Sequence, residues 1–199
     1  MLTDEVPEAS PGLARSRTSR RSRRSRRCRV LVTTLAAAIL AFCGLTARLF
    51  LFPAQGMPGH VDAIVMMDGP GDRLRTAEGL AWAGRAPFLV VSRGSSVYAQ
   101  GSDCAPPIPR VTVICFDPSP ATTQGEAEFA GRLAKRYHWH SLALVTITPQ
   151  DSRARLRMER CFAGQVYVMN APMPFYYWPY ELAYEWGATI KALVVNRSC

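Results

Sequence analysis

The chain has 199 residues, a length that favours one folded domain with appended segments, and a formal net charge of +9. The charge is uneven: residues 1–29 hold nine arginines and three acidic residues, a net +6, whereas the other 170 residues carry only +3. The basic character therefore belongs to the N-terminal tail. No aromatic side chains interleave with these arginines to stack on bases, so we expect no nucleic-acid partner.

The N-terminal 52 residues predict a tail followed by a membrane anchor. Residues 1–29 lack apolar periodicity and are expected to be a disordered cytoplasmic tail. Residues 30–52 are apolar apart from Arg48, and a helix rising about 1.5 Å per residue would cross the roughly 30 Å hydrocarbon core. The positive-inside rule then makes the chain a single-pass plasma-membrane protein with its C-terminal domain outside. A cleaved signal peptide is the alternative, but no small-residue cleavage site directly follows the apolar stretch.

Four cysteines fall in the predicted outer domain: Cys104, Cys115, Cys161 and Cys199. In an oxidising compartment they can form two disulfides with three alternative connectivities, of which Cys104–Cys115 with Cys161–Cys199 closes a local loop and ties down the C-terminus. No cysteine or histidine spacing indicates zinc, so no metal and no cofactor are predicted.

After a linker at residues 53–60, apolar strands alternate with helices through residues 61–199. Strands are predicted at 61–67, 87–92, 111–116, 142–148 and 165–170, with helices ending at Gly84, beginning near Thr123, running from Pro149 to Phe162 and from Glu181 to Val195. The strands are continuous apolar runs, typical of strands buried on both faces. The fold class predicted is therefore α/β, a three-layer sandwich with a mainly parallel, Rossmann-like sheet, preceded by one transmembrane helix.

In such sheets ligands bind at the carboxyl ends of the strands, where several polar residues are expected to meet. Asp68 and Glu126 are the candidates for proton transfer. The candidate ligand-binding residues are Gly69, Arg73, Ser92, Gly94, Thr122, Thr123, Thr146, Gln150 and Arg153. Hydroxyls, carboxylates and arginines at a helix start suit a phosphate or carboxylate ligand. No Ser/His/Asp set is visible, so the sequence leaves open whether the protein is an enzyme.

Each candidate also has a purely structural explanation. The spacings Thr123-x-x-Glu126 and Thr148-x-x-Asp151 match capping boxes. The arginines at 153, 157 and 160 share one helical face, which a solvated surface would explain. On this explanation we expect Arg157 and Arg160 at the surface. Arg153 differs from them because it lies in the first turn of the helix, next to the end of the strand.

The order of the motifs resembles the SanA/ElyC/YdcF family of bacterial envelope-associated α/β proteins. The resemblance covers roughly residues 61–195 and is carried by "DAIVMMDG", "LVVSRG", "ATTQGEAE" and "LVTITPQDSRA", while "YEWG" and "KAL" near the end resemble an actinobacterial branch with a single anchor. It implies an anchored extracytoplasmic domain with a role in cell-envelope maintenance. One soluble member is reported to bind S-adenosylmethionine, and no reaction is assigned to the family.

The sequence departs from the family pattern at Gln150, where many members have a histidine. Glutamine cannot act as a general base at neutral pH, although it can orient a ligand. The function expected is binding or processing of an anionic envelope precursor. The alternatives are a non-enzymatic scaffold that contacts envelope proteins, suggested by the aromatic stretch at 174–186, and a domain that binds a nucleotide or S-adenosylmethionine.

Overall fold

A computed structural model of the chain describes residues 16–94 and 104–199, with side chains from residue 26 onward. The chain divides into two compact units between Leu45 and Thr46. Residues 1–15 of the predicted tail and most of the loop before Cys104 lie outside the described residues.

The described part of the N-terminal unit lies in one long helix, α1 (Ser16–Thr46), and the short π-helix η1 (Ala47–Leu51) follows it at the start of the second unit. The stretch Arg26–Leu51 is long and apolar enough to cross a membrane. Residues 16–29 were expected to be disordered but are helical here. The apolar segment supplies a helix that arginine, a good helix former, can extend.

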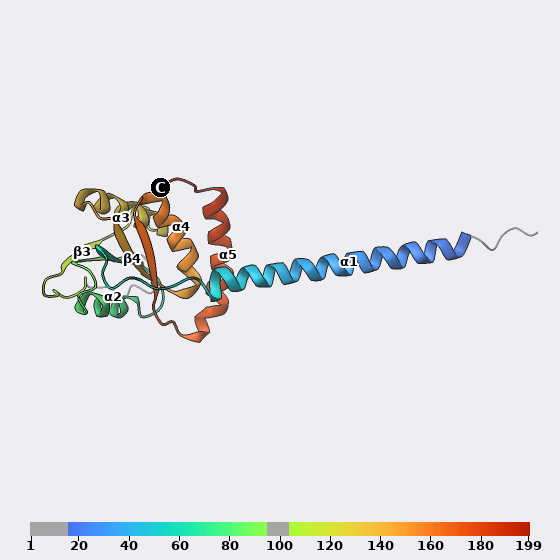
Figure 1. The fold of residues 1–199 in the computed structure, drawn as a ribbon, viewed down its shortest axis with the longest axis horizontal. Helices are drawn as coiled ribbons and strands as arrows, with labels where there is room; N and C mark the ends of the chain where they lie inside the picture. The colour runs from blue at the N-terminus through green and yellow to red at the C-terminus, as the bar shows by residue number, and fades with distance from the viewer. Residues whose placement is uncertain (1–15, 95–103) are drawn as a thin grey trace, which may run out of the picture. The chain divides into compact units, whose positions relative to one another are not determined.

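The domain contains a five-stranded, all-parallel sheet, which confirms the predicted fold class (Figure 1). Its strands lie in the order β3-β2-β1-β4-β5. They are β1 (Ala63–Met66), β2 (Phe88–Ser92), β3 (Thr112–Phe116), β4 (Ser141–Thr146) and β5 (Gln165–Asn170). In β1 every residue is buried, which explains why its sequence shows no polar alternation.

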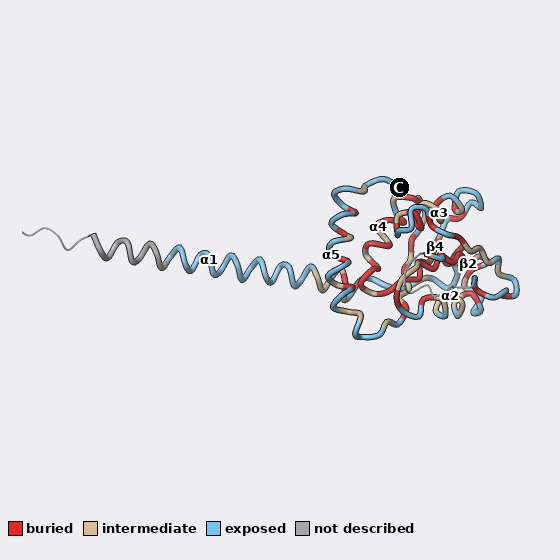
Figure 2. The backbone as a smooth tube through the Cα atoms, turned by 180° about the vertical axis from the view of Figure 1, so that it is seen from behind, coloured by how far each residue is buried: buried red, intermediate tan, exposed pale blue. Residues whose placement is uncertain are grey.

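Helices cover both faces of the sheet, so the domain has three layers (Figure 1). Helix α2 (Arg73–Trp82) packs on one face, where Ala77 and Ala81 join a cluster with Ile64 and Val145. Helices α3 (Thr123–Tyr137) and α4 (Asp151–Cys161) pack on the other face. The buried residues concentrate on the strands and on the inner sides of these helices (Figure 2).

The C-terminal part of the domain carries a short 3-10 helix, η3 (Phe175–Tyr177), and the helix α5 (Trp178–Val194). Another short 3-10 helix, η2 (Thr148–Gln150), joins β4 to α4. Pro149 lies in its first turn, the position where a missing N–H is tolerated.

The folded unit begins earlier than the predicted boundary at residue 61. Phe50 is fully buried, and its ring meets the Trp186 ring edge-on at a centroid distance of 5.2 Å. Ser152 donates a hydrogen bond to the Leu49 carbonyl, and the Gly56 amide donates to the Val168 carbonyl. The buried Phe50 and the hydrogen bonds of Leu49 and Gly56 therefore attach this segment to the domain.

Both disulfides form in the predicted pairing. Cys104 is bonded to Cys115 and Cys161 to Cys199, with Cα–Cα distances of 5.7 and 4.8 Å. The first closes the loop before β3, and the second attaches the C-terminus to the end of α4. Two disulfides are typical of an oxidising, extracytoplasmic compartment.

We expect exactly two cysteines, Cys28 and Cys43, to react with a thiol-alkylating reagent in the denatured, unreduced protein. After reduction all six should react. Mass spectrometry of the alkylated full-length protein counts the modified thiols. Three or more modified cysteines before reduction would contradict the disulfide assignment.

Candidate functional site

Glu126 lies in the first turn of α3, and its carboxylate reaches the end of β1. Its Oε1 accepts a hydrogen bond of 2.6 Å from the Asp68 backbone N–H. The predicted capping box is therefore wrong: Thr122 is the N-cap, and its hydroxyl accepts from the Gly125 amide. Glu126 has no capping role because it accepts from Asp68, which follows β1 and lies 58 residues away in the chain.

Burial dominates the acidity of Glu126, whose side chain is only 3% exposed. Loss of solvation raises the pKa of Glu126 to about 7, although the Asp68 amide, Ser92 and the charge of Arg73 act in the opposite direction. The Ser92 hydroxyl lies close enough to lower this pKa, but it makes no hydrogen bond of standard geometry. A carboxyl with this pKa can both accept and donate a proton at neutral pH.

Arg73 is buried behind the turn that follows β1 and holds that turn in place. Its guanidinium donates to the carbonyl oxygens of Met67, Asp68 and Pro70, and at 3.4 Å to Thr146 Oγ1. Burial lowers the pKa of Arg73 to about 10, against the charges of Glu126 and Asp68. Arg73 therefore acts as a positioning group, and among the contacts of the described residues only its Nη2 donates no hydrogen bond.

Gly69 packs directly on this guanidinium, and its φ of +137° lies in the region that favours glycine. A Cβ there would lie 2.5 Å from Arg73 Nη2. We expect Gly69→Ala to lower the free energy of unfolding by roughly 1–3 kcal/mol. Gly79→Ala, in α2 with open space around it, should instead raise it by up to about 1 kcal/mol. Chemical unfolding of both full-length variants measures the difference, and equal effects would contradict the role given to Gly69.

A directional chain of hydrogen bonds runs from Arg73 to Thr123. Thr146 accepts from Arg73 and donates to Gln150 Oε1 at 2.9 Å, and Gln150 Nε2 donates to Thr123 Oγ1 at 3.1 Å. Arg153 Nη1 also donates to Thr123 Oγ1, at 2.7 Å. Both lone pairs of this hydroxyl are thus used, and among the contacts of the described residues its own proton has no acceptor. Gln150 therefore orients Thr123 as a donor.

Arg153 is not a free anion-binding group. Its Nε and Nη2 each donate at 2.6 Å to Glu185 of α5 in a bidentate ion pair. Burial alone would lower the pKa of Arg153, but hydrogen bonds and the charge of Glu185 outweigh it, and the pKa is raised. The sequence suggested that the charge of Arg153 binds a ligand, but the ion pair with Glu185 neutralises this charge. The remaining nitrogen, Nη1, holds Thr123 in place.

The other arginines of α4 also bind protein groups. Arg157 is only 6% exposed and donates to the Asn196 carbonyl, and Arg160 donates to the carbonyls of Ala192 and Asn196. The expectation of a surface position is wrong for Arg157, which is buried, whereas Arg160 is half-buried and bonded to carbonyls of the C-terminal segment. Asp151 accepts from Asn170 Nδ2 and does not complete a capping box.

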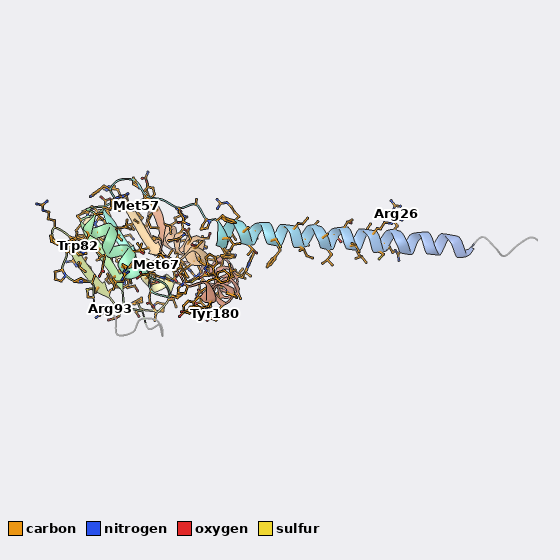
Figure 3. All side chains as sticks on the ribbon, turned by 90° about the horizontal axis from the view of Figure 1, so that it is seen from below. Arg26, Met57, Met67, Trp82, Arg93 and Tyr180 are labelled. Carbon is orange, nitrogen blue, oxygen red and sulfur yellow. A yellow bond between two sulfur atoms is a disulfide. The ribbon has the colours of Figure 1, made fainter. Side chains whose placement is uncertain are left out.

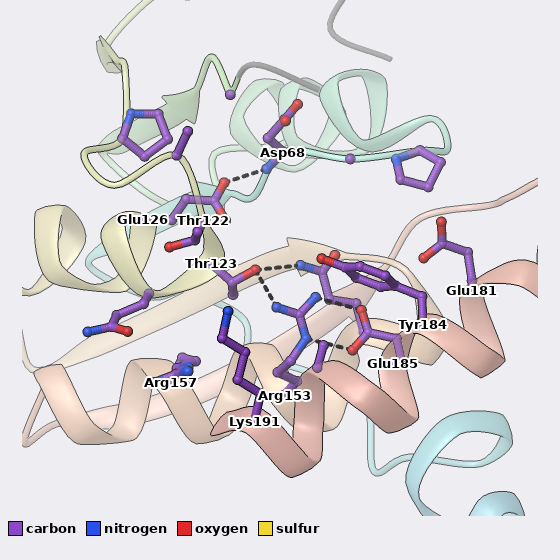
Figure 4. A pocket seen from close by; sticks show the side chains of 18 of the residues that line it. Asp68, Thr122, Thr123, Glu126, Arg153, Arg157, Glu181, Tyr184, Glu185 and Lys191 are labelled. Atoms are coloured by element: carbon purple, nitrogen blue, oxygen red, sulfur yellow. Dashed lines mark hydrogen bonds and ion pairs between the residues drawn. The ribbon is translucent and has the colours of Figure 1, made fainter. Parts of the chain in front are cut away.

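A pocket of about 350 Å³ opens at this edge of the sheet (Figure 4). Most of the predicted site residues line it: Asp68, Gly69, Arg73, Gly94, Thr122, Thr123, Glu126, Gln150 and Arg153. Ser92 and Thr146 are buried at the strand ends and are absent from the lining. The residues come together because parallel strands end at one edge.

Sequence reasoning missed the wall that α5 contributes. Tyr180, Glu181, Tyr184, Glu185 and Lys191 all line the pocket. Figure 4 shows the Lys191 side chain pointing toward Thr123. Burial and the charge of Glu185 raise the pKa of Glu181. The sequence signal that could have predicted this wall is the i, i+4 spacing of Glu181 and Glu185, which places two carboxylates on one face of the helix.

Within residues 16–94 and 104–199, no group of three or more His, Cys, Asp or Glu side chains is placed to hold a metal ion. The groups in the pocket include the Thr123 hydroxyl as a donor, the exposed Lys191 amine and the Glu126 carboxyl, which titrates near neutrality. Comparisons with known protein families, curated proteins and solved structures found no match.

Proposed function

We propose that this is a single-pass plasma-membrane protein whose outer domain binds a phosphate- or carboxylate-bearing envelope precursor in the pocket. In this proposal Thr123 and Lys191 bind the anion and Glu126 exchanges a proton with it. The observation that carries it is the buried Glu126 carboxyl, with a pKa of about 7, in a pocket that also contains unpaired donors. The order of motifs resembling the SanA/ElyC/YdcF family supports an envelope role.

The roles of several residues differ from those that the sequence suggested. Arg153 and Thr146 act through Thr123, because their polar atoms are already bonded to protein groups. Lys191 replaces Arg153 as the cation for the ligand. Gln150 stands where many members of the family have a histidine, and here it positions the Thr123 hydroxyl. Glu126 is then the residue that moves a proton.

Anion binding is tested by thermal unfolding of the full-length protein in detergent, with and without inorganic phosphate. We expect phosphate to raise the unfolding temperature of the wild type, and this shift to shrink in Lys191→Met and Thr123→Val. Lys135→Met, an exposed lysine on α3, is the matched control and should retain the shift. A shift that is absent from the wild type, or equal in all four proteins, would sink the proposal.

The orientation in the membrane is tested by a membrane-impermeant maleimide on intact cells. The proposal predicts no labelling of Cys28 from outside, and labelling of the outer cysteines only after reduction. Labelling of Cys28 from outside would place the domain in the cytoplasm. That result would favour a nucleotide or S-adenosylmethionine as the ligand, since such cofactors are abundant there.

A further inference from the structure

Helix α5 has its polar and apolar faces reversed relative to a usual surface helix. Its buried stripe is Glu181, Glu185, Thr189 and Ala192, and Glu181 and Glu185 are only 5% and 1% exposed. A surface helix of a soluble domain normally turns apolar residues inward and charged residues outward. Here the acidic residues face the pocket and the pair with Arg153, so the opposite face is left apolar.

The outward stripe of α5 consists of Tyr180, Ala183, Gly187, Ile190 and Val194, all exposed. Their spacing of three and four residues places them on one line along the helix. Ile190 is 53% exposed and Val194 62%. Phe175 and Tyr176, just before α5, are 83% and 71% exposed and extend the apolar surface. An exposed apolar stripe along a whole helix is the kind of surface that marks an interaction site.

The first residues of the domain, which directly follow the apolar helix, contact α5. The apolar stretch extends to Leu51, and its last residues, from Thr46, belong to the folded domain. The Trp186 indole of α5 donates to Thr46 Oγ1 at 3.2 Å and packs on the buried Phe50. Thr46 directly follows Leu45 of the apolar helix, so in the chain no residue separates that helix from the segment that packs on α5.

We propose that the outward stripe of α5, together with Phe175 and Tyr176, docks on the lipid surface at the membrane–water interface. This inference rests on the proposed anchor. Tyrosines are enriched at that interface, where the ring is buried among acyl chains and the hydroxyl reaches water. Arg197, which is exposed just after α5, can pair with lipid phosphates. Because Tyr180 belongs to both the stripe and the pocket lining, docking makes the pocket open beside the lipid headgroups.

Spin-label depth measurements test this on full-length protein in phosphatidylglycerol/phosphatidylcholine vesicles. One label is placed at Ile190→Cys, with Cys28 and Cys43 replaced by serine and both disulfides verified by mass spectrometry. Its matched control is Trp82→Cys on α2, which is 59% exposed and lies far from Tyr180 (Figure 3). A third sample carries the label on the native Cys43, within α1.

We expect the label at 190 to be several-fold less accessible to a water-soluble relaxation agent than the label at 82, and more accessible to oxygen. Equal aqueous accessibility at 190 and 82, with Cys43 deep in the bilayer, would overturn the docking and leave the anchor intact. Shielding at 190 from both agents would mean that protein covers the stripe, which also overturns it. An aqueous label at Cys43 would overturn the anchor, and the docking with it.

Discussion

Replacing Glu185 with alanine is expected to lower the free energy of unfolding of the domain by about 3–5 kcal/mol. The carboxylate is 1% exposed and accepts hydrogen bonds from Nε and Nη2 of Arg153. Its removal leaves the Arg153 charge buried without a partner and frees Thr123 from its fixed position. Urea unfolding of the full-length protein in detergent, followed by tryptophan fluorescence, measures the loss.

Two variants separate the ion pair from a general effect of losing a carboxylate. Glu159→Ala, on the exposed side of α4, should change stability by less than about 0.5 kcal/mol. The double variant Arg153→Met with Glu185→Leu removes both charges and should be more stable than Glu185→Ala alone. A double variant that is as unstable as the single one would show that the pair is not what stabilises α5 on the domain.

Replacing Glu126 with glutamine is expected to raise stability at neutral and basic pH while removing proton transfer. The folded pKa is about 7 and the ordinary value is 4.5, so the unfolded chain releases the proton first as the pH rises. The wild type therefore loses stability between pH 4.5 and about 7, on the order of 3 kcal/mol in total. Glutamine keeps an oxygen acceptor for the Asp68 amide and carries no charge.

The stability advantage of Glu126→Gln should be present at about pH 8 and disappear below about pH 4.5. Unfolding curves of both proteins across this range give the difference at each pH. Glu159→Gln, at an exposed position, should show no such pH-dependent difference. If the difference in the free energy of unfolding between wild type and Glu126→Gln does not change with pH, the Glu126 carboxyl titrates normally in the folded protein.

The sheet could be predicted because its signal is local. Runs such as residues 61–67 and 142–148 are apolar without alternation, which indicates strands buried on both faces. Parallel topology then brings the residues that follow each strand to one edge. Asp68, Thr123, Glu126 and Gln150 could therefore be assigned to one site from their positions alone.

The partners within the site could not be predicted because they come from distant segments. The spacing of Thr123 and Glu126 matches a capping box, and only the approach of β1 shows that Glu126 bonds to Asp68 instead. The arginines of α4 have the spacing of a solvated face. The partners of Arg153, Arg157 and Arg160 are Glu185 and the carbonyls of Ala192 and Asn196, which lie more than 30 residues further along the chain.

The central claim is that the pocket binds an anion next to Glu126, which titrates near neutral pH. Isothermal titration calorimetry with sulfate, whose charge is constant in this range, tests it on full-length wild type and Glu126→Gln at about pH 5.5 and about pH 8.5. We predict that wild-type affinity falls several-fold at the higher pH, because ionised Glu126 repels the anion, while Glu126→Gln binds equally at both. No sulfate binding, or the same fall in both proteins, would contradict the claim.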